Sequence, residues 1–166
     1  MYPNLCVIDA NVVIDLDQVG FLGYLQQLPF RVVIPDSVAS NELQSVHAET
    51  GLAEIEVAVL SWPELERAMA LYMETAPSLS LYDVHTLVLA DSWNAVLLTG
   101  DRLLRKRAEE MGLRVHGVLW LLDLMVTLEI IRCLDAVQAV KQMLAGGSRL
   151  PEAEIRKLKW KWGCAM

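Results

Sequence analysis

Short apolar runs alternate with longer amphipathic segments along the chain. The short runs are rich in Val, Ile and Leu and have the length of buried strands, whereas the longer segments repeat apolar residues at helical spacing. The predicted strands cover residues 5–9, 31–35, 55–60, 95–99 and 113–116. The predicted helices cover residues 11–28 (with a break near Gly20 or Gly23), 36–43, 63–75, 80–94, 102–111, 118–128, 134–144 and 151–160. Strands that alternate with helices in this way favour an α/β fold with a central, mostly parallel five-stranded sheet covered on both faces.

A length of 166 residues fits a single domain, 1–166. We expect its core at about residues 5–128 and a helical extension at about residues 133–162, broken by glycines near residue 147. Hydrophobic residues make up 54% of the chain, and the mean hydropathy is +0.35. The most apolar stretch is nevertheless interrupted by Asp123 and Glu129, so no membrane span is expected.

Charge and cysteine content narrow the classes of partner and compartment. The net charge of −7 argues against a broad basic surface for duplex DNA, although basic clusters occur near residues 102–107 and 157–161. Cys6, Cys133 and Cys164 are odd in number and widely spaced, which indicates neither a metal-binding pair nor a disulfide framework. Because the N-terminus also lacks the pattern of a signal peptide, we expect a cytoplasmic protein.

Four acidic residues stand at or near the end of a predicted strand or the start of a predicted helix: Asp9, Glu42, Asp83 and Asp101. Ligands of an open parallel sheet bind beyond the carboxyl ends of its strands, where the strand order reverses. Carboxylates gathered there repel one another unless a cation lies between them, and oxygen ligands suit Mg²⁺ or Mn²⁺. The set therefore predicts a site for one or two such ions.

Each acid also has a structural interpretation that the sequence leaves open. Asp9 and Asp101 can cap the helices that follow them. Ser80 and Asp83 have the spacing of a capping box, which stabilises a helix start without any catalytic role. Glu42 can be an ordinary surface residue of its helix.

The local sequences around these acids resemble the motifs of PIN-domain nucleases. Residues 7–14 resemble the opening motif, a hydrophobic strand that ends in Asp with a small polar residue two places on. Residues 40–43, after the Pro-x-x-Val segment at 35–38, resemble the second acidic motif. Residues 79–83 resemble the third, and residues 97–102 resemble the fourth, with its Thr-x-Asp core intact. The order of the four motifs also fits the family.

This resemblance covers about residues 5–125. It implies a three-layer α/β/α fold and a metal-dependent ribonuclease that hydrolyses single-stranded RNA. The metal ligands and catalytic residues would be the four acids named above, with water attacking the phosphorus in line and leaving 5′-phosphate and 3′-hydroxyl ends. Asn11 and Thr99 would support the ligands or orient the substrate, and Arg102 would contact a phosphate.

The C-terminal tail, with its glycine-containing break and final helix, resembles a subgroup of uncharacterised bacterial and archaeal PIN proteins close to VapC-type toxins. That likeness makes the toxin of a toxin–antitoxin pair a candidate function, with an antitoxin protein as a candidate partner. Trp160 and Trp162 could stack on RNA bases, but packing is the favoured interpretation at a chain end. The apolar run at residues 119–134 is longer than one amphipathic face needs, which motivates a homodimer.

The chain lacks residues that the chemistry of two other protein classes requires. A haloacid dehalogenase phosphatase needs a second Asp where this chain has Asn11. A phosphoacceptor receiver domain needs an Asp at the end of the third strand and a Lys at the end of the fifth, where this chain has Ser61 and His116. The alternative that stays open is a catalytically weak or silent PIN-like module that acts through a protein complex.

Overall fold

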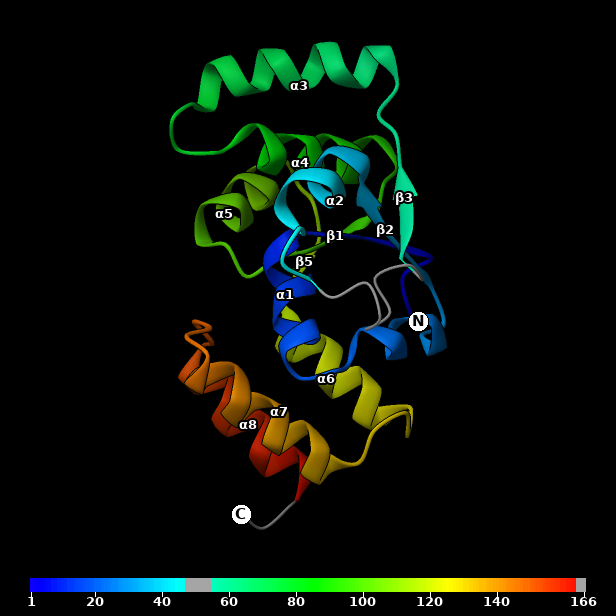
Figure 1. Cartoon of the computed structure of the whole chain (residues 1–166), viewed down its shortest axis with the longest axis vertical. Helices are drawn as coiled ribbons and strands as arrows, with labels where there is room; N and C mark the ends of the chain where they lie inside the picture. The colour runs from blue at the N-terminus through cyan, green and yellow to red at the C-terminus, as the bar shows by residue number, and fades with distance from the viewer. Residues whose placement is uncertain (47–54, 164–166) are drawn as a thin grey trace.

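The computed structural model describes residues 1–46 and 55–163, and its elements form three layers with a five-stranded sheet between helices (Figure 1). The strands are β1 (Leu5–Ile8), β2 (Arg31–Pro35), β3 (Glu56–Ala58), β4 (Val96–Leu98) and β5 (Val115–His116). The helices are α1 (Ala10–Gln18), the 3₁₀ helix η1 (Leu22–Gln27), α2 (Asp36–Glu42), α3 (Trp62–Thr75), α4 (Leu81–Ser92), α5 (Arg102–Glu110), α6 (Val118–Thr127), α7 (Cys133–Ala145) and α8 (Glu152–Trp162).

The strand order, β3-β2-β1-β4-β5, creates a switch point in the middle of the sheet. The chain runs outward from β1 through β2 to β3, and then returns to place β4 on the other side of β1. All four strand pairings are parallel, so the carboxyl ends of β1 and β4 lie side by side. This is the position at which an open parallel sheet binds its ligands.

Alternation along the strands divides the core between the two faces of the sheet. Cys6 and Ile8 of β1 belong to one cluster with residues of α1, α6 and α7, whereas Val7 between them belongs to a second cluster with residues of α4 and α5. Strands β2 and β4 alternate in the same way, as expected for strands buried on both faces. The predicted α/β/α layering is therefore confirmed, and the sheet is parallel throughout.

The break predicted near Gly20 or Gly23 in the helical segment at 11–28 is confirmed at Gly20. The segment at 11–28 ends at Gln18, and a separate 3₁₀ helix follows it. Gly20 lies between the two with φ of +72°, a left-handed conformation that glycine adopts without steric cost and that ends an α-helix.

The C-terminal helices pack against α1 and α6. Val140 and Met143 of α7 and Ile155 of α8 are buried in the same apolar cluster as the residues of α1 and α6. That cluster also takes up most of the apolar run at 119–134 that motivated the prediction of a homodimer, although Leu134 at its end is 56% exposed. The length of this run is therefore explained by contacts within one chain.

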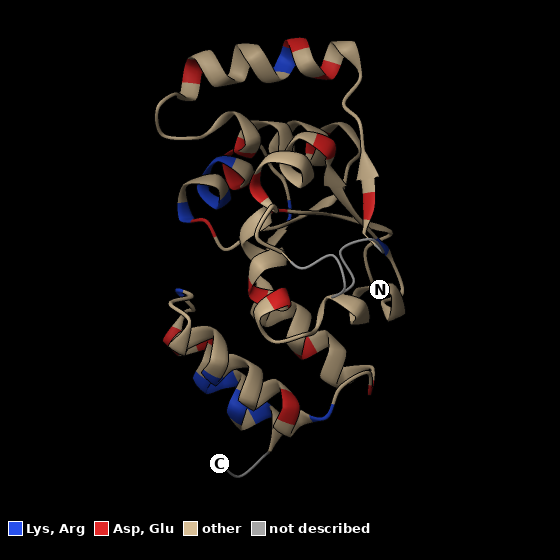
Figure 2. Ribbon diagram, viewed as in Figure 1, with Lys and Arg blue, Asp and Glu red and all other residues tan. Residues whose placement is uncertain are grey.

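Polar contacts hold this extension in place as well. Gln18 on α1 donates from Nε2 to the carbonyl oxygen of Gln142 on α7 (3.2 Å). Helix α8 carries basic side chains (Figure 2), and Lys161 and Trp162 at its end both donate to the Asp123 carboxylate on α6. The prediction that the two tryptophans pack at the chain end is therefore correct for Trp162. It is wrong for Trp160, which is 89% exposed and does not pack on the described part of the chain.

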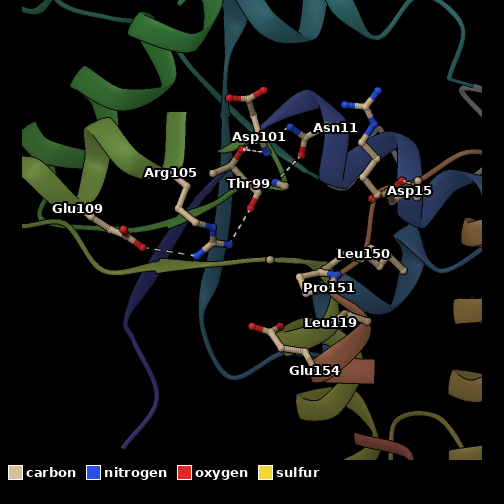
Figure 3. Close-up of a pocket in the computed structure, with 15 residues that line it drawn as sticks. Asn11, Asp15, Thr99, Asp101, Arg105, Glu109, Leu119, Leu150, Pro151 and Glu154 are labelled. Atoms are coloured by element: carbon tan, nitrogen blue, oxygen red, sulfur yellow. Dashed lines mark hydrogen bonds and ion pairs between the residues drawn. The ribbon is translucent and has the colours of Figure 1, made fainter. Parts of the chain in front are cut away.

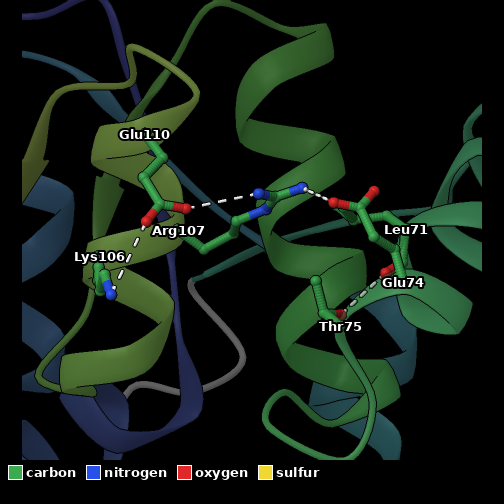
Figure 4. Close-up of polar contacts among 6 residues, drawn as sticks. All are labelled: Leu71, Glu74, Thr75, Lys106, Arg107 and Glu110. Atoms are coloured by element: carbon green, nitrogen blue, oxygen red, sulfur yellow. Dashed lines mark hydrogen bonds and ion pairs between the residues drawn. The ribbon is translucent and has the colours of Figure 1, made fainter.

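On the other face, α3 is the outermost helix and lies over α4 (Figure 1). Arg107 of α5 bridges to it, because the guanidinium pairs with Glu74 at 2.7 Å and with Glu110 of its own helix at 3.4 Å (Figure 4). The outer side of α3 exposes large apolar side chains, among them Trp62 and Met73, which are 72% and 76% exposed.

No helix of the described residues is long and apolar enough to cross a membrane. Cys6 is buried and free, and burial raises the pKa of its thiol to about 12. Cys133 is disulfide-bonded, so the interpretation of the scattered cysteines as unpaired is wrong for this residue.

Candidate active site

An open pocket of about 370 Å³ lies at the carboxyl ends of β1 and β4. We call it the acid pocket. The residues that line it are Asp9, Ala10, Asn11, Ile14, Glu42, Asp83 and Asp101. Its four carboxylates come from the end of β1, the end of α2, the first turn of α4 and the residue before α5. The fold thus brings together all four acids that the sequence singled out.

Asp9 is the buried member of the set, with 3% of its surface exposed. The Ala10 N–H donates to Oδ1 (2.8 Å), and the Thr99 hydroxyl and Asn11 Nδ2 donate to Oδ2 at 2.8 Å and 2.6 Å. The pKa of Asp9 is raised to about 7, chiefly by burial and to a lesser extent by the charges of Asp83 and Glu42, against the opposing effect of the bonds from Thr99 and Ala10. None of the described cationic side chains forms an ion pair with Asp9.

Asn11 and Thr99 tie the ends of β1 and β4 together. The Oδ1 atom of Asn11 accepts from Gly100 N–H (2.8 Å), so its Nδ2 must face Asp9 and the Thr99 hydroxyl. Thr99 is fully buried, and its hydroxyl oxygen also accepts from Asp101 N–H (3.0 Å). These bonds fix the orientation of the Asp9 carboxylate and the start of the Asp101 turn.

Asp101 and Asp83 both form the helix-capping hydrogen bonds that their sequence positions suggested. Asp101 caps α5, and both cap bonds, from Leu103 and Leu104 N–H, go to Oδ1. Asp83 forms a capping box with Ser80 and uses Oδ2 to accept from the Ser80 N–H. Each cap engages one carboxylate oxygen and leaves the other free to accept a ligand, so capping and ligand binding are compatible.

Glu42 completes the pocket from the last residue of α2. Its side chain is half-buried, and its pKa is raised by burial and by the charge of Asp83. The carboxylates of Glu42, Asp83 and Asp9 therefore repel one another in this pocket.

The donors fit a hard divalent cation in their chemistry. They are all oxygens, they surround one pocket, and the buried Asp9 carries a charge that no described cation balances. Their spacing is looser than a coordination sphere, because no three His, Cys, Asp or Glu side chains among the described residues are close enough to hold one ion. Binding would therefore draw side chains such as Glu42 and Asp101 inward.

Arg102 is exposed at the start of α5 and does not line the acid pocket. Arg105, one turn further along, reaches the same edge of the sheet (Figure 3). Its guanidinium donates to the carbonyl oxygens of Thr99 (3.1 Å) and Val115 (3.4 Å) and lies 3.9 Å from Glu109. Arg105 of the basic cluster near residues 102–107 is therefore held against the end of the sheet. The signal was its spacing of four residues from Asp101, the N-cap of α5, because residues four apart lie on the same side of a helix.

A second cavity, of about 580 Å³, adjoins the acid pocket and shares Asn11 and Asp101 with it. We call it the side pocket. Its walls come from α1, the turn after β4, α5, the start of α6 and the connection between α7 and α8 (Figure 3). Asp15 of α1 accepts a hydrogen bond from the Ser148 hydroxyl of that connection, and burial raises its pKa. Sequence reasoning missed both residues, which stand 133 positions apart.

His85 and His116 lie outside the acid pocket. His85 shares a hydrogen bond with the Ser37 hydroxyl (2.8 Å), and His116 stacks on Trp120 with ring centroids 4.3 Å apart. Burial lowers the pKa of both rings. His47 lies outside the described residues.

Comparison with known families agrees with this geometry. The model of a PIN-domain family, DUF3368, matches residues 5–163. The chain belongs to the PIN-domain family. Its members are nucleases that generally use divalent metals, and the family resemblance inferred from the motifs is confirmed.

Solved PIN-like structures share the fold at low sequence identity. A PilT N-terminus domain protein from Sulfolobus solfataricus is 19% identical with a TM-score of 0.50, covering 69% of this chain and 87% of its own. PAE2754 from Pyrobaculum aerophilum is 22% identical with a TM-score of 0.50, covering 70% and 90%. A chain of VapBC2 from Rickettsia felis, bound to a fragment of promoter DNA, is 17% identical with a TM-score of 0.51, covering 68% and 98%. No curated protein matches the chain.

Proposed function

We propose that this PIN-domain protein is a Mg²⁺- or Mn²⁺-dependent endoribonuclease that hydrolyses phosphodiester bonds of single-stranded RNA. The observation that carries the proposal is the acid pocket, where four carboxylates from separate elements meet at the switch point of the sheet. Membership of a nuclease family supports it.

Asp9, Glu42, Asp83 and Asp101 would hold one or two ions. When bound, the ions supply a positive charge for the attacked phosphate and an activated water as nucleophile. Asp9 is the fixed anchor, because the Ala10, Asn11 and Thr99 bonds set its orientation. Asp83 and Asp101 would use the oxygens that their helix caps leave free.

The other predicted residues have supporting roles in this proposal. Asn11 and Thr99 keep Asp9 in place, and Asn11 also fixes the turn at Gly100. Arg102 is exposed beside Asp101 and would contact a phosphate of the RNA as it enters.

The proposal is tested with a fluorophore–quencher RNA of unstructured sequence. We expect cleavage in Mn²⁺ or Mg²⁺, none in EDTA, and products with 5′-phosphate and 3′-hydroxyl ends. Cleavage that survives EDTA, or products that end in a 2′,3′-cyclic phosphate, would contradict it.

We further propose that the nuclease acts as the toxin of a toxin–antitoxin pair and that it assembles as a homodimer. The support for a toxin is the shared fold with a chain of VapBC2. The support for assembly is the apolar outer side of α3, which includes Met69 at 53% exposure besides Trp62 and Met73. Growth arrest on induced expression, relieved by Asp9→Ala, tests the toxin; light scattering at micromolar concentration tests the dimer.

The same exposed side of α3 keeps a second candidate function open. A PIN module that is weak in catalysis can act through a complex formed on such a surface. A protein that binds Mn²⁺ and a protein partner but leaves all RNA substrates intact would favour this alternative.

A further inference from the structure

The side pocket has no role in holding the ions, yet it opens directly beside the acid pocket. The two share Asn11 and Asp101, so a strand whose phosphate lies at the four carboxylates has its neighbouring nucleotide at the mouth of the side pocket. The volume of about 580 Å³ is in the range of small-molecule sites, which leaves room for one nucleotide.

The charges around the side pocket select against a second phosphate. Four carboxylates line it, from Asp15, Asp101, Glu109 and Glu154, against two guanidinium groups, from Arg105 and Arg149. A phosphate there would meet a net negative wall. A neutral group with several N–H donors matches these acceptors better.

The rest of the wall suits a flat ring. Leu119 of α6 is buried, and Leu150 and Pro151 form an apolar side opposite Arg105 (Figure 3). Arg105 is already held by the Thr99 and Val115 carbonyl oxygens, so it forms a fixed edge of the pocket. A nucleobase combines an apolar face with a polar edge, as this wall requires.

We propose that the side pocket binds one unstacked nucleobase of the RNA next to the scissile phosphate, with guanine as the preferred base. Guanine presents two neighbouring donors, N1–H and the N2 amino group, to one carboxylate, and presents O6 and N7 as acceptors to an arginine. The structure offers Glu154 as that carboxylate and Arg149 as that arginine. Both side chains are exposed, and neither forms an ion pair with another described residue. The inference rests on the proposed nuclease function, for which it names a specificity pocket.

The pocket exists because of the C-terminal extension. Ser148, Arg149, Leu150 and Pro151 belong to the connection between α7 and α8, and the Ser148–Asp15 bond fixes that connection to α1.

The test measures binding separately from cleavage. Fluorescein-labelled oligouridines with a single central guanosine, inosine or adenosine are titrated by anisotropy in Ca²⁺, and the same RNAs are incubated in Mn²⁺ to map cuts. Inosine lacks only the N2 amino group, so it isolates the contact with a carboxylate. We expect wild-type affinity to fall about tenfold from guanosine to inosine, and the same change to cost less than about threefold in Glu154→Gln.

Glu152→Gln is the matched control, because Glu152 lies two residues away on the exposed side of α8, pairs with Arg156 and lines neither pocket. It should discriminate guanosine from inosine as the wild type does. Equal affinity for the three RNAs, or discrimination that Glu154→Gln leaves intact, would overturn the base pocket even if the RNAs are cut. Guanosine-selective binding without any cleavage in Mn²⁺ would support the pocket and overturn the nuclease proposal instead.

Discussion

The acid pocket and the side pocket lie next to each other and are both lined by carboxylates, yet they are built in different ways. The acid pocket is made at the switch point of the sheet, where Asp9 is buried and fixed by Asn11 and Thr99. The side pocket is closed by a connection late in the chain that reaches α1 through the Ser148–Asp15 bond. Its acids lie beside two arginines and an apolar wall.

The difference separates two tasks. Rigid strand ends position a carboxylate precisely enough for metal chemistry, because neighbouring strands fix one another in register. A helical hairpin outside the sheet can vary without disturbing those strand ends, so it is suited to choosing what lies beside the reacting phosphate. Substitutions in the acid pocket should therefore remove activity on every RNA, and those in the side pocket should change only which RNA is preferred.

The largest effect is expected from Asp9→Asn. It removes the buried charge that would anchor the ions in the proposed site, and we expect RNA cleavage to fall by about a thousandfold or more for all sequences. Asp15→Asn removes an acid of the side pocket and should retain cleavage within about tenfold. Single-turnover cleavage of the labelled RNA in Mn²⁺ measures both. Equal losses in the two variants would remove the distinction between the pockets.

The pH dependence of stability in EDTA should show the buried charge directly. Because the pKa of Asp9 is raised from 3.8 to about 7 in the folded state, the folded protein binds this proton more tightly than the unfolded chain does. Its contribution to stability is then present below about pH 4 and is lost as the pH rises to about 7, on the order of 4 kcal/mol at about 1.4 kcal/mol per unit.

Urea unfolding in EDTA across this range is the measurement. In Asp9→Asn, the free energy of unfolding should decline less over this pH range than it does in the wild type. A wild-type profile that is level or rises between these pH values would show that Asp9 does not carry an unbalanced charge.

Two Glu→Gln variants compare one carboxylate from each pocket: Glu42→Gln in the acid pocket and Glu109→Gln in the side pocket. Glu42 lines the acid pocket and feels the charge of Asp83, whereas Glu109 lines the side pocket beside Arg105. We expect Glu42→Gln to weaken Mn²⁺ binding by about 10- to 100-fold and to melt slightly higher in EDTA. Glu109→Gln should bind Mn²⁺ as the wild type does. Calorimetric titration with Mn²⁺ decides between them.

Thr99→Val should have a smaller effect of the same kind. The substitution keeps the shape but removes the hydroxyl that donates to Asp9 and that lowers the pKa of its carboxyl. Mn²⁺ affinity should fall by about tenfold. Thr86→Val is the control, since Thr86 is equally buried but donates to the Tyr82 carbonyl oxygen within α4. If both variants bind Mn²⁺ equally well, the Thr99 hydroxyl does not orient a ligand.

The sequence was informative where position follows from strand order. Asp9 and Asp101 could be placed at one edge because both follow strands that a parallel sheet brings together. It was uninformative where position depends on how distant helices pack. Asp15 and Ser148 are far apart in sequence. The apolar run at 119–134 was interpreted as an assembly surface because nothing in the local sequence shows that α7 and α8 cover most of it.

The most direct test of the central claim, one metal site shared by four carboxylates, is the rise in melting temperature that Mn²⁺ produces. Asp101→Asn is the decisive variant, because Asn caps a helix about as well as Asp and the α5 cap should survive. Asp36→Asn on α2 is the control outside both pockets. A shared site predicts a large Mn²⁺ shift in the wild type and the control and a much smaller one in Asp101→Asn. Equal shifts in all three proteins would mean that Asp101 is only a helix cap and that the acid pocket is not a shared metal site.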